Sequence, residues 1–151
     1  MSLVFLGILS APLLFPQSSS ERLTVGTPQK VVGKRNQSVQ IHIPLSILTG
    51  YHVNNDKPPD PSLIPMKLTW TSLGALEGGQ VTYPKPETIK VGDMSLAVFT
   101  GKVDLVVNFK VSANAPGGPG AAAGRLEYQA CNNTTCYPPK RVDITVPYQV
   151  Q

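Results

Sequence analysis

The sequence of 151 residues has few charged residues, few aromatic residues and only two cysteines. Charged residues make up 15% of the chain and leave a net charge of +4. The lysines and arginines are scattered, and the only basic pairs are Lys34-Arg35 and Lys140-Arg141. A protein that binds nucleic acid needs a denser basic face, often with aromatic residues between the charges. The composition therefore argues against a nucleic-acid partner.

Helical periodicity is also missing. No segment spaces its apolar residues by three and four positions over three turns, which excludes a long helix. Fifteen prolines and thirteen glycines instead indicate many turns between short elements. The chain has no internal repeat, and its length and 41% hydrophobic content suit one domain with a packed core.

The motifs of several enzyme classes are absent as well. The chain has no Gly-x-Ser-x-Gly elbow and no phosphate-binding glycine loop, so hydrolase and nucleotide-dependent functions have no residues to rest on. Two histidines and two cysteines could in principle bind zinc. Their spacing lacks a ligand pattern, however, and His42 is predicted to face solvent on a distant strand. We therefore expect neither a metal nor a small-molecule cofactor.

Alternating apolar and polar residues predict several β-strands. The clearest runs cover residues 39–47, 66–70, 103–111, 126–130 and 142–148. Three shorter candidates cover residues 23–25, 81–83 and 96–100. A long loop with three prolines is expected at 54–62. The segment 113–124 is almost entirely Ala, Gly and Pro, and we expect a flexible connection between two strands there. The pattern predicts an all-β fold, an antiparallel β-sandwich of immunoglobulin-like type.

The start of the chain has the character of an export signal. Residues 1–15 are rich in leucine and carry no charge, and a serine run follows before the first charged residue, Glu21. Basic residues before the apolar stretch and a clear Ala-x-Ala site are missing, and an apolar edge strand is the alternative. We therefore divide the chain into a signal-like segment, 1–20, and a domain, 21–151, and expect an exported protein.

The two cysteines, Cys131 and Cys136, have four residues between them. A bridge between them closes a six-residue loop, which constrains the unfolded chain by about 2 kcal/mol, against about 4 kcal/mol for a bridge across half a domain. Such a bridge is a weak structural link, but only a local loop has to rearrange when it opens. The spacing leaves both a small structural disulfide and a redox switch open.

The surroundings of the pair predict a hairpin. Strands that end before the first cysteine and restart after Pro138-Pro139 place 132–135 in a tight turn, where facing Cα atoms lie about 4.5 to 5.5 Å apart and can be bridged. The spacing is not that of a Cys-x-x-Cys helix start, so activation has to come from exposure and from neighbours such as Lys140 or Arg141. The two prolines predict a stiff, partly unpaired edge that exposes Cys136 to a partner thiol, although a simple kink would also explain them.

The cysteine segment resembles a known protein family. Tyr128-Gln129-Ala130-Cys131, four residues, and Cys136-Tyr137-Pro138-Pro139 are similar to the amino-terminal periplasmic domain of the bacterial thiol:disulfide interchange protein DsbD. Three upstream segments also resemble that family: Gly50-Tyr51-His52-Val53-Asn54, Lys57-Pro58 and Leu63-Ile64-Pro65. The similarity runs in order over roughly 21–150.

The resemblance implies a redox function. In this family an immunoglobulin-like sandwich accepts electrons through its cysteine pair from a thioredoxin-like domain. It passes them to periplasmic isomerases and to thioredoxins of cytochrome c maturation. Cys136 would form the mixed disulfides with partners and Cys131 would resolve them, so the chain would be a thiol:disulfide interchange (protein-disulfide reductase type) carrier. The alternative is an immunoglobulin-like binding or assembly module whose disulfide only secures a hairpin.

The resemblance further implies a setting for this chemistry. The only redox group is the disulfide. The partners are thioredoxin-like proteins or domains, together with a membrane electron-transfer domain. The location is the periplasm, with membrane association through fused or partner domains.

The same resemblance points to residues around the pair. Tyr51 and His52 are expected to lie near the cysteines and to tune them, as are Tyr137 and Pro138, with ordinary packing as the alternative. A cap loop that shields the pair is expected at about 89–96.

The centre of this cap would be Val91, Gly92, Asp93 and Met94. It lacks the aromatic residue found in the best-known members and offers Val91 and Met94 instead.

Overall fold

The computed structural model describes residues 21–151, so the signal-like segment 1–20 lies outside the described residues. The described chain folds into strands joined by turns and loops, without a helix. The strands are β1 Leu23–Val25, β2 Val31–Gly33, β3 Ser38–Ile47, β4 His52–Asn54, β5 Lys67–Ser72, β6 Leu76–Thr82, β7 Glu87–Val91, β8 Met94–Phe99, β9 Lys102–Val111, β10 Gly118–Tyr128, β11 Ala130–Cys131 and β12 Lys140–Val150.

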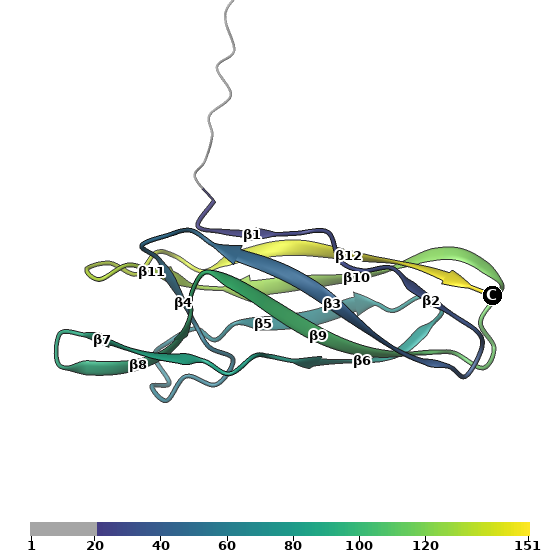
Figure 1. Ribbon diagram of the computed structural model, residues 1–151, viewed down its shortest axis with the longest axis horizontal. Coiled ribbons are helices and arrows are strands. Elements are labelled where there is room, and N and C mark those ends of the chain that lie inside the picture. The colour runs from purple at the N-terminus through teal and green to yellow at the C-terminus, as the bar shows by residue number, and fades with distance from the viewer. Residues whose placement is uncertain (1–20) are drawn as a thin grey trace, which may run out of the picture.

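The strands form three four-stranded sheets (Figure 1). Two of them, with strand orders β1-β3-β9-β6 and β2-β12-β10-β5, are the layers of a sandwich. The third, β11-β4-β8-β7, lies at the end of the elongated molecule opposite the C-terminus. All strand pairs in this part of the chain are antiparallel except β2 with β12. The predicted immunoglobulin-like antiparallel sandwich is therefore confirmed.

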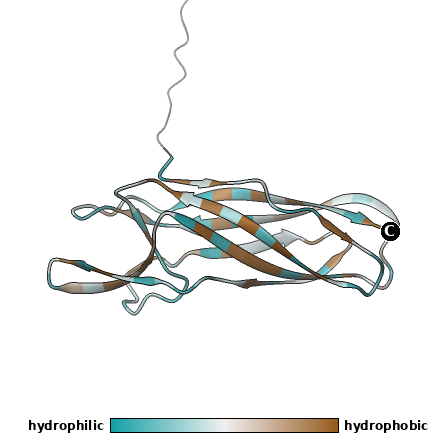
Figure 2. Ribbon diagram, in the orientation of Figure 1, coloured by the Kyte–Doolittle hydropathy of each residue, from teal (hydrophilic) through white to brown (hydrophobic). Residues whose placement is uncertain are grey.

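The core lies between the two large sheets. Along β3 and β9 every second residue is buried, and Figure 2 shows apolar and polar positions alternating on these strands. The buried side chains of the two strands are Ile41, Ile43, Leu45, Ile47, Val103, Leu105, Val107, Phe109 and Val111. Since side chains alternate between the two faces of a strand, this pattern fixes which face meets the opposite sheet.

The prediction of a flexible connection at 113–124 is wrong for most of its length. Residues 118–124 are the first part of β10 and pair residue by residue with β12. Small residues are needed there because large ones lie against them: a Cβ added at Gly120 would meet the Tyr148 ring at 2.2 Å. The Ala and Gly content therefore reflects close packing within a strand.

Four short strands were not predicted, namely β2, β4, β7 and β11. Each has five residues or fewer, and alternation cannot be recognised over so short a run. Three of them belong to the third sheet, so the sequence did not predict the sheet that carries the first cysteine. The predicted long loop is confirmed, since no strand lies between β4 and β5.

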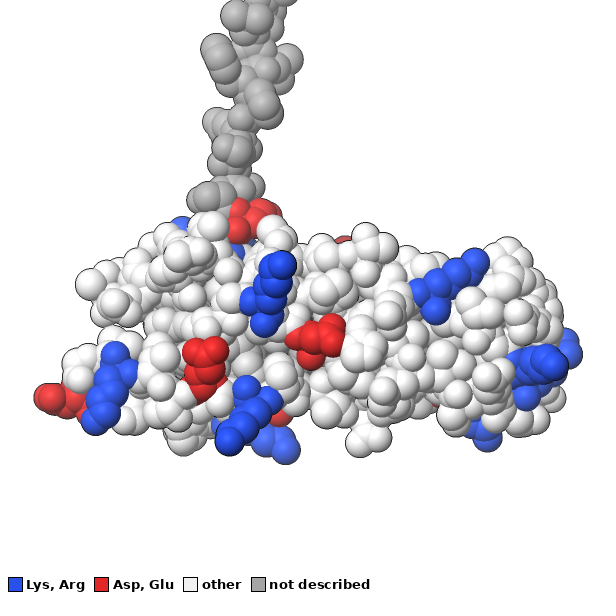
Figure 3. All heavy atoms as spheres, in the orientation of Figure 1, with Lys and Arg blue, Asp and Glu red and all other residues white. Residues whose placement is uncertain are grey.

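Charged side chains are scattered over the face seen in Figure 3, with acidic residues between basic ones. Among residues 21–151, none belongs to a helix long and apolar enough to cross a membrane.

Candidate functional site

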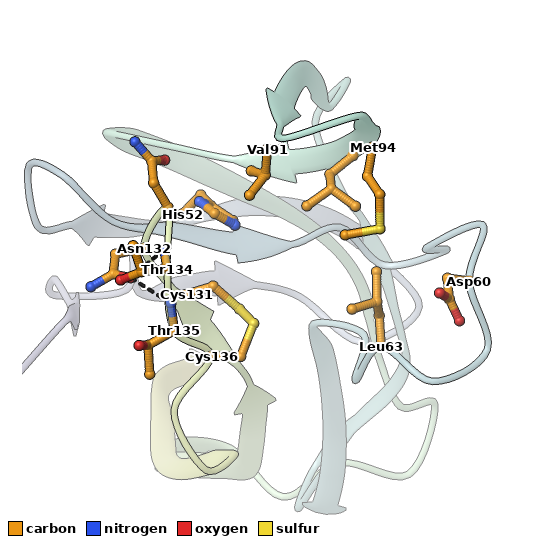
Figure 4. Close-up of a pocket in the computed structure, with 12 residues that line it drawn as sticks. His52, Asp60, Leu63, Val91, Met94, Cys131, Asn132, Thr134, Thr135 and Cys136 are labelled. Carbon is orange, nitrogen blue, oxygen red and sulfur yellow. Dashed lines mark hydrogen bonds between the residues drawn. A yellow bond between two sulfur atoms is a disulfide. The ribbon is translucent and has the colours of Figure 1, made fainter.

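Cys131 and Cys136 form a disulfide within a hairpin at the end of the molecule that carries the third sheet (Figures 1 and 4). Their Cα atoms are 4.0 Å apart, slightly closer than the predicted range, and the two residues form an isolated antiparallel bridge. Asn132 N–H donates to the Thr135 carbonyl and Tyr137 N–H donates to the Ala130 carbonyl, both at 2.9 Å. The predicted tight turn between the cysteines is therefore confirmed.

The turn is held by one side chain. Oδ1 of Asn132 accepts hydrogen bonds from Thr134 N–H (2.9 Å), Thr134 Oγ1 (3.0 Å) and Thr135 N–H (2.7 Å). Asparagine side chains commonly stabilise turns by bonding to the backbone two residues ahead. The hairpin therefore keeps its shape without a glycine.

The two cysteines differ sharply in exposure. Cys131 belongs to β11 and is 2% exposed, whereas Cys136 is exposed to solvent. The three residues after Cys136, which include Pro138-Pro139, form no strand before β12 begins. Because prolines have no N–H to donate, this edge stays free of a paired strand. Cys136 is therefore the more accessible residue of the pair.

A pocket of about 200 Å³ adjoins the disulfide (Figure 4). Besides the hairpin residues 131–136, its lining consists of His52, Asp60, Leu63, Val91, Met94 and Leu96. These side chains come from β4, the loop after β4, β7 and β8. The third sheet and the long loop therefore build the surroundings of the disulfide together.

The expected cap residues lie at the turn of the β7–β8 hairpin. Val91 pairs with Met94, and both side chains line the pocket. Gly92 and Asp93 form the exposed turn between them, and Gly92 has a φ of 61°, which glycine adopts without strain. Met94 is itself 58% exposed, so the hairpin forms one wall of the pocket beside the disulfide.

His52 is buried, at 4% exposure, and stands opposite Cys131 in the β4–β11 pair. Burial lowers the pKa of His52, so the imidazole is neutral at pH 7. Asp60 is exposed, and its Oδ1 accepts hydrogen bonds from Ser62 N–H (2.8 Å) and Ser62 Oγ (2.7 Å). These bonds lower the pKa of Asp60, so the pocket has one neutral base and one carboxylate.

Tyr51 and Tyr137 do not line this pocket but lie close to each other, with ring centroids 6.0 Å apart. The guanidinium of Arg22 lies 3.4 Å from the Tyr137 centroid and 5.5 Å from the Tyr51 centroid. A cation over an aromatic ring stabilises such a cluster by about 0.5 to 2 kcal/mol, depending on desolvation. Sequence analysis missed Arg22 because it lies far along the chain from Tyr137, and no motif links the two.

Gln129 was quoted above as part of a motif, but its role was not predicted. Its Oε1 accepts hydrogen bonds from Asn54 Nδ2 (3.2 Å) and Ile64 N–H (3.4 Å), and its Nε2 donates to the Tyr137 carbonyl (3.3 Å). The side chain therefore joins β4, the long loop and the segment that follows Cys136.

Other residues considered from sequence lie away from the pair. Lys140 and Arg141 do not line the pocket, and Arg141 pairs with Glu127 at 2.6 Å. His42 is on β3, with Nδ1 of its ring hydrogen-bonded to the carboxylate of Asp104 on β9. Across residues 21–151 no group of three or more His, Cys, Asp or Glu side chains is placed to hold a metal ion.

Comparisons with known proteins agree with this geometry. The model of the protein family described as thiol:disulfide interchange protein DsbD, N-terminal, matches residues 21–147. No curated protein sequence matches the chain.

Among solved structures, the N-terminal periplasmic domain of ScsB from Proteus mirabilis is similar, with a TM-score of 0.57 and 17% identity. The match covers 89% of this chain and 48% of that one, so the chain spans about half its length. The reduced DsbD N-terminal domain of Neisseria meningitidis gives a TM-score of 0.47 and 20% identity over 74% of this chain and 82% of that one.

The family match extends over most of the described chain and includes both cysteines, the β4 segment and the β7–β8 hairpin. The likeness to ScsB independently supports the fold. The chain belongs to the family of the N-terminal domain of thiol:disulfide interchange protein DsbD.

Proposed function

We propose that this domain is a redox carrier that passes reducing equivalents between thioredoxin-like proteins through Cys131 and Cys136. The observation that carries the proposal is the unequal exposure of the two sulfur-bearing residues, one open to solvent and one 2% exposed. Thiol–disulfide exchange needs access to one sulfur of the pair, while the second has only to reach the first. Membership of the DsbD family supports the same chemistry.

In the reduced domain, Cys136 as thiolate attacks one sulfur of a partner disulfide. A bond forms between Cys136 Sγ and that sulfur, and the second partner sulfur leaves as a thiolate and takes up a proton. Cys131 then attacks Cys136 Sγ, the Cys131–Cys136 bond forms, and the first partner sulfur leaves. The partner disulfide gains two electrons and two protons, and the cysteine pair loses the same number.

Family membership supports a setting for this chemistry. The partners are thioredoxin-like proteins or domains, including those of cytochrome c maturation, and a membrane electron-transfer domain resupplies the electrons. The protein acts in the periplasm and uses no cofactor besides its disulfide. The apolar lining of the pocket, from Leu63, Val91 and Met94, suits a partner loop that approaches the disulfide. Tyr51, Tyr137 and Pro138 hold the segment that presents Cys136, and Val91 and Met94 act as the cap.

A trapping experiment tests the carrier function. The reduced Cys131→Ala variant is mixed with a thioredoxin-like domain that keeps only its exposed cysteine, activated as a mixed disulfide with thionitrobenzoate. We expect release of the coloured anion and a covalent complex that dithiothreitol dissolves, since Cys136 remains accessible.

The matched control is Cys136→Ala, in which the remaining thiol is buried and should capture no partner. Capture by neither variant, or by both equally, would contradict the proposal. A disulfide that resists millimolar glutathione, with a potential below about −300 mV, would instead favour a purely structural bridge.

A further inference from the structure

His52 is a buried titratable side chain that faces the disulfide. It lies directly opposite Cys131 in the β4–β11 pair, and the two residues are 4% and 2% exposed. Opposed residues of an antiparallel pair point to the same face of the sheet, with Cβ atoms about 4.5 to 5.5 Å apart. Both side chains line the same pocket, and Figure 4 shows them on the same side of it, across from Leu63 and Met94. An imidazole is therefore placed beside the buried sulfur.

The second half of the exchange reaction needs a proton acceptor at this place. The thiolate, not the thiol, is the nucleophile. A thiol removed from water ionises less readily, because burial disfavours the charged form. Cys131 has almost no contact with solvent, so bulk water cannot readily take its proton.

The other groups around the pocket are poor acceptors. Besides His52 and the two cysteines, Asp60 is the only titratable side chain that lines the pocket. The pKa of Asp60 is lowered, so its carboxylate is a weak base. The strands that pair with β4 are β8, which has no titratable side chain, and β11, which has only Cys131. The turn 132–135 has none either. His52, whose pKa is lowered by burial, is neutral at pH 7 and keeps a free lone pair.

We propose that His52 is the proton acceptor of the resolving step, an inference that rests on the redox-carrier function proposed above. In the mixed disulfide, an imidazole nitrogen of His52 takes the proton of the Cys131 thiol while Cys131 Sγ attacks Cys136 Sγ. The Cys131–Cys136 bond forms as the bond between Cys136 and the partner breaks. The partner sulfur leaves as a thiolate and is protonated by water, and the imidazolium returns its proton to solvent. In the reverse direction the same group protonates Cys131 as it leaves.

A stopped-flow experiment with the reduced domain and dithiobis(nitrobenzoate) separates the two steps. Attack by Cys136 releases one thionitrobenzoate at a rate that increases with probe concentration, and attack by Cys131 releases the second at a rate that does not. We expect His52→Gln to slow the second release about a hundredfold at pH 7, the lower end of typical general-base effects, and to leave the first unchanged. His42→Gln, at the only other histidine of the chain, is the matched control and should change neither release.

The pH profile distinguishes proton transfer from a structural effect. With His52 as base, the second release in the wild type should be nearly constant between pH 6.5 and 8 and should decline as the imidazole protonates at lower pH. The difference in rate between His52→Gln and wild type should narrow at high pH, where the Cys131 thiol ionises without a base. Because Cys131 is buried, this narrowing should begin above the value of about 8.5 at which a free thiol ionises. Added imidazole should accelerate the second release in His52→Ala but not in His42→Ala.

Three results would overturn the role of His52. The first is an unchanged rate of the second release in folded His52→Gln. The second is a difference in that rate between His52→Gln and wild type that stays constant up to high pH. The third is a wild-type rate of the second release that is proportional to hydroxide concentration from pH 6 to 8. The wild-type measurement applies even if the variants fold poorly. Absence of the first release in the wild type would instead count against Cys136 as the attacking residue, and therefore against the proposed function itself.

Discussion

Single side chains determine how the disulfide reacts. The exposed Cys136 and the buried Cys131 share one bond, and His52 faces the buried member of the pair. The same burial that places His52 beside Cys131 also lowers the pKa of the imidazole, because a charged ring would lose its hydration. The burial that makes His52 the proposed base therefore also makes its protonation costly for the fold.

At the residue scale we predict that His52 makes the stability of the domain depend on pH. Its pKa in the unfolded chain is near 6.5 and is lower in the folded state. Below pH 6.5 the unfolded chain binds a proton that the folded state does not, so the free energy of unfolding falls as the pH drops from 6.5 through the folded pKa. Above pH 6.5 both states are neutral and the effect vanishes. Urea unfolding of wild type and His52→Gln between pH 5 and 8 measures the difference.

Because His52 is neutral in both states at pH 8, the difference between wild type and His52→Gln at pH 8 is the reference from which the change at lower pH is measured. Parallel curves for wild type and His52→Gln over the whole range would show that burial of this ring has no energetic consequence.

The short elements of the third sheet surround the disulfide. β11 carries Cys131, β4 carries His52, and the β7–β8 hairpin supplies Val91 and Met94. Neighbouring strands of the third sheet share only two to five residue pairs, whereas β10 and β12 share eleven and β3 and β9 share nine. Separating these short strands would therefore break fewer hydrogen bonds than separating β10 from β12 or β3 from β9.

At the element scale we predict that Met94→Ala accelerates reduction of the disulfide by glutathione severalfold. The substitution removes part of the apolar wall that the β7–β8 hairpin places over the pocket. Quenching samples with an alkylating reagent and counting modified cysteines by mass spectrometry gives the rate. Val32→Ala is the matched control, since Val32 is also an exposed apolar residue, at 43%, but lies on β2 at the other end of the molecule. Equal rates in both variants would exclude a shielding role for Met94.

For the whole molecule, the disulfide is a local link at one end of the sandwich. The core lies mainly between β1-β3-β9-β6 and β2-β12-β10-β5 and continues into the third sheet through Val53, Phe99 and Ala130. The disulfide closes only a hairpin in which the cysteines are five positions apart. The pairing of strands within the two large sheets does not involve this hairpin.

At this scale we predict that reduction lowers the free energy of unfolding by about 2 kcal/mol, the value expected for so short a loop. Domains of this size are usually stable by about 5 to 15 kcal/mol, so the reduced form should remain folded. Urea unfolding with and without reductant measures the loss, and the double variant Cys131→Ala/Cys136→Ala should match the reduced protein. Unfolding on reduction at 25 °C would mean that the disulfide is a structural requirement.

Much of the fold could be predicted from the sequence. The alternation along β3 and β9 identified both strands and their buried faces, because a side chain on a strand has only two directions to point. The first part of β10 could not be predicted, since its Gly and Ala residues have meaning only against Tyr148. The third sheet was also missed, because strands of two to five residues leave no periodic pattern.

For the site, the chain by itself determined the hairpin: four residues between two cysteines, with an asparagine first and prolines after, can form a bridged turn through local contacts alone. The two prolines also predicted that Cys136 is the accessible cysteine, and the family resemblance placed His52 near the pair. Only the tertiary structure decided that Cys131 is buried, that His52 stands directly opposite it, and that Arg22 covers Tyr137. These contacts join segments far apart in the chain, and such contacts exist only after the sheets have packed.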